Sequence, residues 1–198
     1  MLADQFEGRR LNSPNDVVVH SDGGIWFTDP TYGILSDYEG YQAEPEQSGR
    51  NVYRIDPHTL QIACVADDFE QPNGLAFSPD GKTLYIADSA RSHDPDAAHH
   101  IRAIQVVDNC RLGSSRVLTH IEPGIPDGLR IDVQGNIWTS AGDGIQCFDA
   151  NGVMLGKIKL PEKVANLTFG GPRRNRLFIA ANTSLYMIHV AVAGAQVP

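Results

Sequence analysis

The stretch PNGLAFSPDGKTLYIAD, residues 72–88, decides the fold. It predicts an inner strand over 72–77, a turn rich in Pro, Asp and Gly over 78–82, and a second strand over 83–88. The same unit recurs in three further places, the last of them divergent: residues 14–29, 126–140 and 165–180. A self-similar unit with a period of roughly 40–58 residues indicates a repeat architecture.

Each unit is followed by further strand-like segments. Third strands are predicted at 51–56, 101–106, 144–148 and 184–189, and fourth strands at 61–65, 115–119 and 154–160. The fourth repeat shows no fourth strand, only an Ala/Gly-rich tail. Four-stranded units arranged around an axis are the blades of a β-propeller, so we expect an all-β fold in one propeller domain over residues 1–198, with about four blades. A two-sheet sandwich is the alternative, but it does not require the same motif before every inner strand.

Two segments stand outside this pattern. Residues 2–6 predict a short strand ahead of the first repeat. Insertions at 30–50 and 89–100 both follow second strands, so both leave from the face on which the Pro-Asn and Pro-Asp loops lie. Insertions of that length on one face are commonly functional.

Composition narrows the function classes. The chain has 198 residues, is 41% hydrophobic and carries a net charge of -8, which argues against nucleic acid or an anionic membrane as a partner. Its apolar runs have the length of strands, and its start resembles no signal peptide. The cysteines Cys64, Cys110 and Cys147 are widely spaced, which is typical of reduced thiols, so we expect a cytoplasmic protein.

Oxygen-bearing side chains recur just before the inner strands. They are Asn15, Asn73, Asp127 and Asn166. In a propeller these positions converge near the axis, with Asp16 beside the first and with Asp29 and Asp88 returning to the same face on the second strands. Amide and carboxylate oxygens without thiolate or histidine suit a hard cation such as Ca²⁺ or Mg²⁺. The alternative is that each Asn or Asp only caps its own turn.

At these residues the sequence resembles the senescence marker protein/gluconolactonase family, in particular its bacterial sugar-lactonase branch. The matching stretches are 11–19, 26–33, 71–88, 126–129, 139–144 and 164–171. They span nearly the whole chain, and together they are specific.

The resemblance implies a metal-dependent propeller that hydrolyses a sugar lactone to the aldonic acid. It implies that Asn73 and Asp127 hold a divalent cation, Ca²⁺ with Mg²⁺ or Zn²⁺ as alternatives, and that Asp127 acts as general base. Substrate or metal-bound water would be contacted by the remaining predicted site residues: Asn15, Asp16, Asp29, Tyr32 and Asn166.

The chain also departs from the family pattern. Members of the family resemble six-bladed rings, whereas this chain holds about four repeats and lacks the N-terminal Glu ligand, since Glu7 lies in the wrong place in the order. We therefore expect a lactonase without its first two blades. Open blade edges would then favour a homo-oligomer, unless residues 2–6 close a four-bladed ring. The functional alternatives are an impaired fragment or binding module, and hydrolysis of a phosphotriester or aryl ester on the same scaffold.

Overall fold

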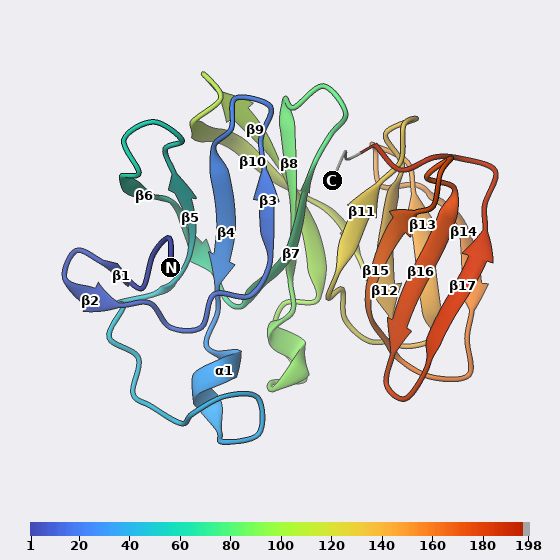
Figure 1. Cartoon of the computed structure of the whole chain (residues 1–198). Helices are drawn as coiled ribbons and strands as arrows, with labels where there is room; N and C mark the ends of the chain where they lie inside the picture. The colour runs from blue at the N-terminus through green and yellow to red at the C-terminus, as the bar shows by residue number, and fades with distance from the viewer. Residues whose placement is uncertain (196–198) are drawn as a thin grey trace.

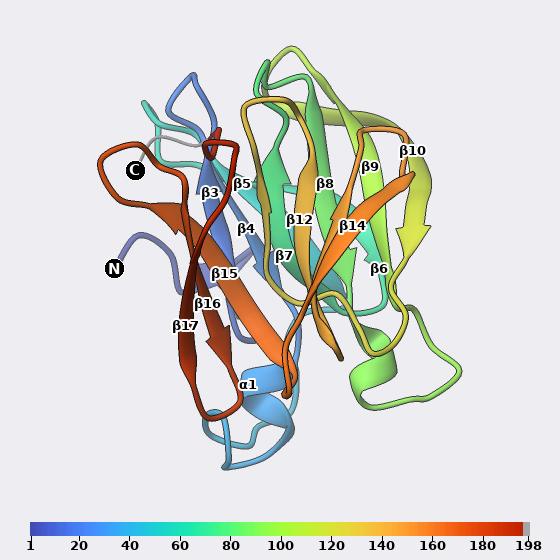
Figure 2. The same cartoon turned by 90° about the vertical axis from the view of Figure 1, so that its right-hand side faces the viewer.

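The computed structural model describes residues 1–195, which are almost entirely β-structure. Four antiparallel sheets stand side by side as propeller blades, with β3, β7, β11 and β15 as their inner strands (Figures 1 and 2). Within each blade, strands that are consecutive in sequence pair with one another. The all-β propeller predicted from the repeats is therefore confirmed.

The strands follow the predicted order closely. Blade 1 contains β3 (Val17–Val19), β4 (Ile25–Asp29), β5 (Arg50–Ile55) and β6 (Ile62–Phe69), and blade 2 contains β7 (Pro72–Phe77), β8 (Thr83–Asp88), β9 (His100–Val107) and β10 (Arg111–His120). Blade 3 contains β11 (Leu129–Ile131), β12 (Ile137–Ala141), β13 (Gly144–Phe148) and β14 (Met154–Lys159), and blade 4 contains β15 (Val164–Gly170), β16 (Arg176–Ala181) and β17 (Leu185–His189). Within residues 1–195, blade 4 has three strands, as its sequence predicts.

The N-terminal segment does not complete blade 4. Its strand β1 (Gln5–Phe6) pairs with β2 (Arg9–Arg10) in a separate two-stranded hairpin. The ring of Phe6 packs on Tyr53 of blade 1, with centroids 5.0 Å apart. The proposed closure of a four-bladed ring by residues 2–6 is therefore wrong, because this segment bonds to its own hairpin partner and covers the outer face of blade 1.

Apolar side chains bind the blades together in pairs. One buried cluster joins blades 1 and 2, where Trp26 meets Phe77 edge-on at 5.6 Å. A second joins blades 2 and 3, and a third joins blades 3 and 4. Among the described residues no such cluster joins blade 4 back to blade 1. The blades therefore form an open arc.

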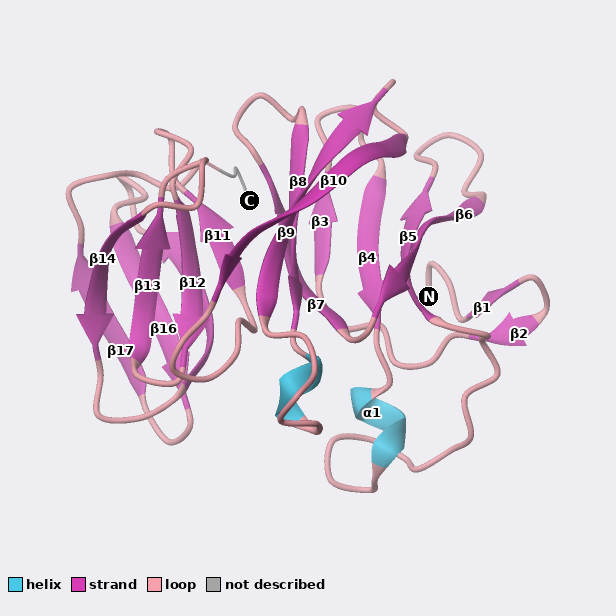
Figure 3. Cartoon of the chain, turned by 180° about the vertical axis from the view of Figure 1, so that it is seen from behind, coloured by secondary structure: helices cyan, strands magenta, loops and turns pink. Residues whose placement is uncertain are grey.

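The two insertions contain short helices that the sequence pattern did not predict. They are α1 (Tyr32–Leu35) and the 3₁₀ helix η1 (Ala90–Ser92), and Figure 3 shows both at one end of the blades. One or two turns are too short to produce a helical hydrophobic period. No helix in the part of the chain described here is long and apolar enough to cross a lipid bilayer.

Candidate functional site

Glycines after the recurring Asn and Asp bring the inner-strand starts into contact. The Gly74 N–H donates to the Asp127 carbonyl over 3.1 Å, and the Gly128 N–H donates to the Ala165 carbonyl over 2.9 Å. A Cβ atom at Gly74 would lie 2.2 Å from the Asp127 carbonyl oxygen, well inside van der Waals contact. The glycines are therefore required by close approach between blades, and that approach gathers the polar side chains at one end of the axis.

Three of the predicted residues, one from each of three blades, lie next to one another. The Asn15 side-chain amide donates to Oδ1 of Asn73 over 3.2 Å. Asn73 is buried, at 5% exposure, and its side chain lies close enough to the Asp127 carboxyl to lower the pKa of that group. We call Asn15, Asp16, Asn73 and Asp127 the polar mouth.

Asp127 is the electrostatic centre of the polar mouth. Burial, together with the negative charges of Asp16 and Glu39, raises the pKa of its carboxyl to about 7, although the Asn73 side chain acts in the opposite direction. A carboxylate with a pKa near neutrality is partly ionised at physiological pH and is a stronger base than an ordinary Asp. The Asp127 N–H is held by the Ser140 hydroxyl over 2.8 Å, which fixes the start of the loop.

Asp16 contacts its own blade and blades 2 and 3. Its N–H donates to the Thr28 hydroxyl over 3.2 Å, and its Oδ2 accepts the Leu75 N–H over 3.4 Å. The Arg130 guanidinium of blade 3 lies 3.6 Å from the same oxygen. Asp16 therefore brings a second negative charge to the mouth, and Arg130 partly balances it.

Asp29 lies away from solvent and holds a loop. Its side chain is fully buried, and its two oxygens accept the N–H groups of Asn12 and Ser13 over 2.9 and 2.8 Å. Burial raises its pKa to about 6, although both hydrogen bonds act in the opposite direction. In blade 2 the Asp88 carboxylate accepts the N–H groups of Glu70 and Gln71 in the same way. These two aspartates fix the segments that lead into the inner strands.

Tyr32 of α1 brings the first insertion to the mouth. Its hydroxyl is buried near Ser89 and Ser92, yet within residues 1–195 it makes no hydrogen bond of normal geometry. Burial raises its pKa to about 12, and the charges of Asp127 and Asp88 act in the same direction. Its ring lies 5.6 Å from that of His93. Tyr32 therefore lies close enough to Asp127 for the carboxylate charge to raise the pKa of the Tyr32 hydroxyl.

His93 and Glu39 were missed by the sequence reasoning. Each belongs to an insertion, where no repeat register exists to indicate its direction. The one usable signal is that both insertions leave from the end of the blades that carries the mouth.

Asn166 takes a different place from the other recurring residues. Its Oδ1 accepts the N–H of its own neighbour Leu167 over 2.8 Å, and a Cβ atom at Gly128 would lie 2.1 Å from that oxygen. Because Gly128 bonds to the Ala165 carbonyl as Gly74 bonds to that of Asp127, Ala165 holds the corresponding position in blade 4. Asn166 therefore borders the mouth one residue beyond the position that corresponds to Asp127.

The donor atoms of the mouth fit a hard cation. No three His, Cys, Asp or Glu side chains of residues 1–195 are grouped to hold a metal ion. The mouth instead offers the Asn73 amide oxygen and the Asp127 carboxylate, an oxygen-only set that suits Ca²⁺ or Mg²⁺. The raised pKa of Asp127 reflects a half-buried carboxylate that has no cationic partner among residues 1–195, and a bound cation would supply one. With so few protein donors, water or ligand oxygens would complete the coordination.

Comparison with known proteins places the chain among relatives of similar architecture. A family model described as "SMP-30/Gluconolactonase/LRE-like region" matches residues 1–183. A gluconolactonase of Zymomonas mobilis is 31% identical over 204 residues, covering 98% of this chain and 55% of the relative. A lactonohydrolase of Aspergillus oryzae is 28% identical, covering 98% and 48%.

Solved structures agree with this placement. A gluconolactonase structure from Xanthomonas campestris superposes with a TM-score of 0.86 at 37% identity, covering 97% of this chain and 60% of that one. The chain spans about half the length of the curated relatives it matches.

Proposed function

The chain belongs to the SMP-30/gluconolactonase/LRE-like family, and on that premise we propose that it hydrolyses a sugar lactone to the aldonic acid with the help of a divalent cation. Relatives named gluconolactonase and lactonohydrolase support lactone hydrolysis as the reaction class. The observation that carries the proposal for this chain is Asp127, a half-buried carboxyl with a pKa raised to about 7 and held by Asn73.

In the proposed reaction, Asp127 is the general base. Its carboxylate takes a proton from a water molecule whose oxygen forms a bond to the lactone carbonyl carbon. Collapse of the tetrahedral intermediate breaks the ring C–O bond, and the proton on Asp127 passes to the departing alkoxide. The Asn73 side chain lowers the pKa of Asp127 and so favours the ionised form that can accept the proton.

The other residues of the mouth would orient the reactants. Asn73 and Asp127 would hold the cation, which when bound would polarise a carbonyl and stabilise negative charge on its oxygen, and would bring the pKa of Asp127 below its value in the cation-free chain. Asn15 and Asp16 lie where they could hold the water and the sugar hydroxyls. The unpaired hydroxyl of Tyr32 is available to a sugar hydroxyl, and Asn166 would border the ligand from blade 4. Asp29 would contribute indirectly, by fixing the loop ahead of Asn15.

Hydrolysis of D-glucono-δ-lactone by the purified chain, with Ca²⁺ added or removed by chelation, tests this proposal. Asp127→Asn keeps the size of the side chain and removes the base, so we expect turnover to fall by a factor of about 10² or more. Asp67→Asn, at an exposed position in β6, is the matched control. Turnover by Asp127→Asn within twofold of the parent would overturn the assignment of the base.

A binding module that does not turn over substrate is the second candidate. The absence of a three-residue acidic or His cluster in residues 1–195 favours it, because a weakly held cation contributes little to catalysis. Saturable Ca²⁺ binding that is lost in Asp127→Asn, without hydrolysis of any lactone, aryl ester or phosphotriester in a substrate panel, would identify this alternative.

We also propose that copies of the chain associate through blade edges and that the protein acts in the cytoplasm. In the described part of the chain, the outer edge of β17 has no paired strand, and such edges readily accept one. The three cysteines are free, which suits a reducing compartment. Light scattering that finds only monomer at high concentration would contradict the association.

A further inference from the structure

One turn position differs in blade 4 from the other three blades. Each turn between the first and second strand contains a residue in the left-handed region whose N–H bonds to the carbonyl three residues earlier, over 2.9 Å in every case. In the first three blades that residue is glycine: Gly23, Gly81 and Gly135, with φ of 86°, 70° and 85°. In blade 4 it is Arg174, with φ of 53°.

An arginine in this position is unfavourable for the fold. A left-handed backbone brings Cβ close to the carbonyl oxygen in any residue except glycine, and a long charged side chain gains nothing from it. Strained positions of this kind cluster at functional sites. The fourth turn therefore carries an arginine where glycine suits the backbone, which makes Arg174 a candidate functional residue.

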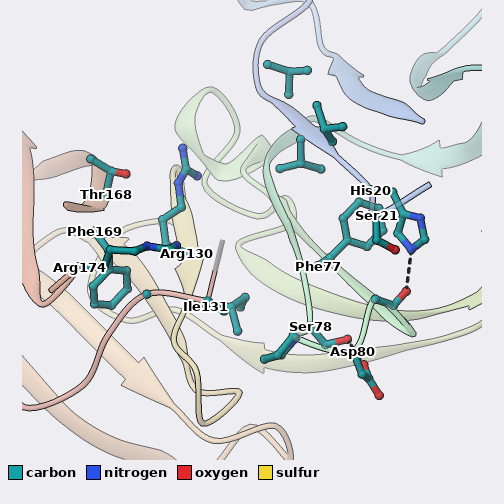
Figure 4. Close-up of a pocket in the computed structure, with 17 residues that line it drawn as sticks. His20, Ser21, Phe77, Ser78, Asp80, Arg130, Ile131, Thr168, Phe169 and Arg174 are labelled. Carbon is teal, nitrogen blue, oxygen red and sulfur yellow. Dashed lines mark hydrogen bonds between the residues drawn. The ribbon is translucent and has the colours of Figure 1, made fainter. Parts of the chain in front are cut away.

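Arg174 lines a cavity of about 760 Å³ that runs along the inner strands of all four blades (Figure 4). Arg130 of β11 lines the same cavity from another wall. Apolar walls adjoin them, including Val17 and Val19, which are 56% and 62% exposed, and Phe169. A concave, partly apolar space with a few convergent polar groups is typical of small-molecule sites.

The positive charges in this cavity have few negatively charged partners, which favours the binding of an anion. No carboxylate of residues 1–195 lies within ion-pair distance of Arg174. Arg130 has one carboxylate partner in residues 1–195, Asp16 at 3.6 Å, and its Nη1 also donates to the Leu129 carbonyl over 2.6 Å. The Asp80 carboxylate at the rim is already bonded to the Ser78 hydroxyl and the Lys82 N–H. A chain with a net charge of -8 thus presents two guanidinium groups to one cavity.

We propose that this axial cavity, which adjoins the polar mouth through the contact between Arg130 and Asp16, is a binding site for an organic carboxylate. The carboxylate group pairs with the guanidinium groups of Arg130 and Arg174, whose planar N–H groups match a carboxylate. The apolar part of the ligand lies against Val17, Val19 and Phe169. Arg174 is not among the hydrolytic residues named above, whereas Arg130 contacts Asp16 of the polar mouth, so the Arg174 variant separates this proposal from lactone hydrolysis.

Calorimetric titration with octanoate tests the site. We expect saturable binding by the parent chain, and at least tenfold weaker binding by Arg174→Gly. That variant restores the residue used in the other three turns, so its melting temperature should equal or exceed that of the parent. Arg173→Gly, one residue earlier in the same exposed turn and outside the cavity lining, is the matched control and should bind octanoate as the parent does.

A second variant and two further ligands complete the test. Arg130→Met should also weaken binding at least tenfold, because it removes the guanidinium and keeps an unbranched side chain. Acetate and inorganic phosphate, which carry charge without an apolar body, should bind at least tenfold more weakly than octanoate. The proposal is overturned if the parent binds no octanoate, if Arg174→Gly binds it as tightly as the parent, or if acetate or phosphate binds equally well.

Discussion

The side-chain amide of Asn15 donates to Oδ1 of Asn73 over 3.2 Å, joining the first blade to the second across 58 residues of sequence. This bond occupies one lone pair of the Asn73 oxygen and leaves its NH₂ group available to the Asp127 carboxyl, whose pKa the Asn73 side chain lowers. Asn73 is therefore the residue that connects the polar mouth, because it contacts both neighbours at once.

Asn73→Ala should impair the mouth without unfolding the blades. Hydrogen bonds to charged groups contribute about 1.5–3 kcal/mol, so we expect turnover at pH 7 to fall about tenfold or more. The lost bond lowers the Asp127 pKa in the parent, so the acidic limb of the pH–rate profile should move to higher pH in the variant. Asn182→Ala, exposed in blade 4, should leave the profile unchanged. An unshifted limb in Asn73→Ala would contradict the role given to this bond.

Gly74→Ala should destabilise the arc of blades. The added Cβ would lie 2.2 Å from the Asp127 carbonyl oxygen, so blades 2 and 3 must separate locally, at a cost of about 1–3 kcal/mol. Gly156→Ala is the control, because nothing lies within 4 Å of its added Cβ. Urea unfolding of both variants measures the difference. Equal midpoints for the two variants would mean that the close approach is not needed.

Asp29 should make the stability depend on pH in an unusual direction. Its pKa is raised from 3.8 to about 6, so the folded chain binds its proton more tightly than the unfolded chain does. The resulting stability is fully present below about pH 4 and is lost as the pH rises through about 6, by up to about 3 kcal/mol. Comparing urea unfolding of the parent and Asp29→Asn at pH 4 and pH 7 isolates this contribution. If the difference between the two proteins does not change with pH, the prediction fails.

His100 should give the stability of the fold the opposite dependence on pH. Burial lowers its pKa, as do the positive charges of His120, Arg102 and His99, whereas Asp88 acts in the other direction. A folded state that favours the neutral imidazole is stabilised above the unfolded pKa of about 6.5 and loses that stability as the pH falls.

Thermal unfolding between pH 7.5 and 5.5 measures the contribution of His100. His100→Gln should show a smaller decrease in melting temperature over that range than the parent. His58→Gln, in an exposed turn, should decrease as the parent does. Parallel curves for the parent and His100→Gln would rule out a role for this histidine.

The repeat allowed the fold to be predicted because its signals are local. Alternating apolar residues, Pro-Asn and Pro-Asp starts and Gly turns depend on neighbours in the chain, so strands and blades could be located without distant contacts. The same local logic failed for residues 2–6, which look like a strand without a partner. Their partner proved to be Arg9–Arg10, a match that depends on the turn at Glu7 and Gly8, where both residues have positive φ.

The sequence by itself determined the blade unit, the end of the axis at which polar residues gather, and the oxygen-only character of that set. Only the tertiary structure decided which of those residues meet. In that structure Asn15, Asn73 and Asp127 lie next to one another, and Asp29 is buried and holds a loop. Asn166 lies one residue beyond the corresponding position, and Tyr32 lies near enough to Asp127 for its pKa to respond to that charge. The physical reason is that hydrogen-bond reach and desolvation depend on spacing between blades, and that spacing is set by close contacts such as Gly74 against Asp127.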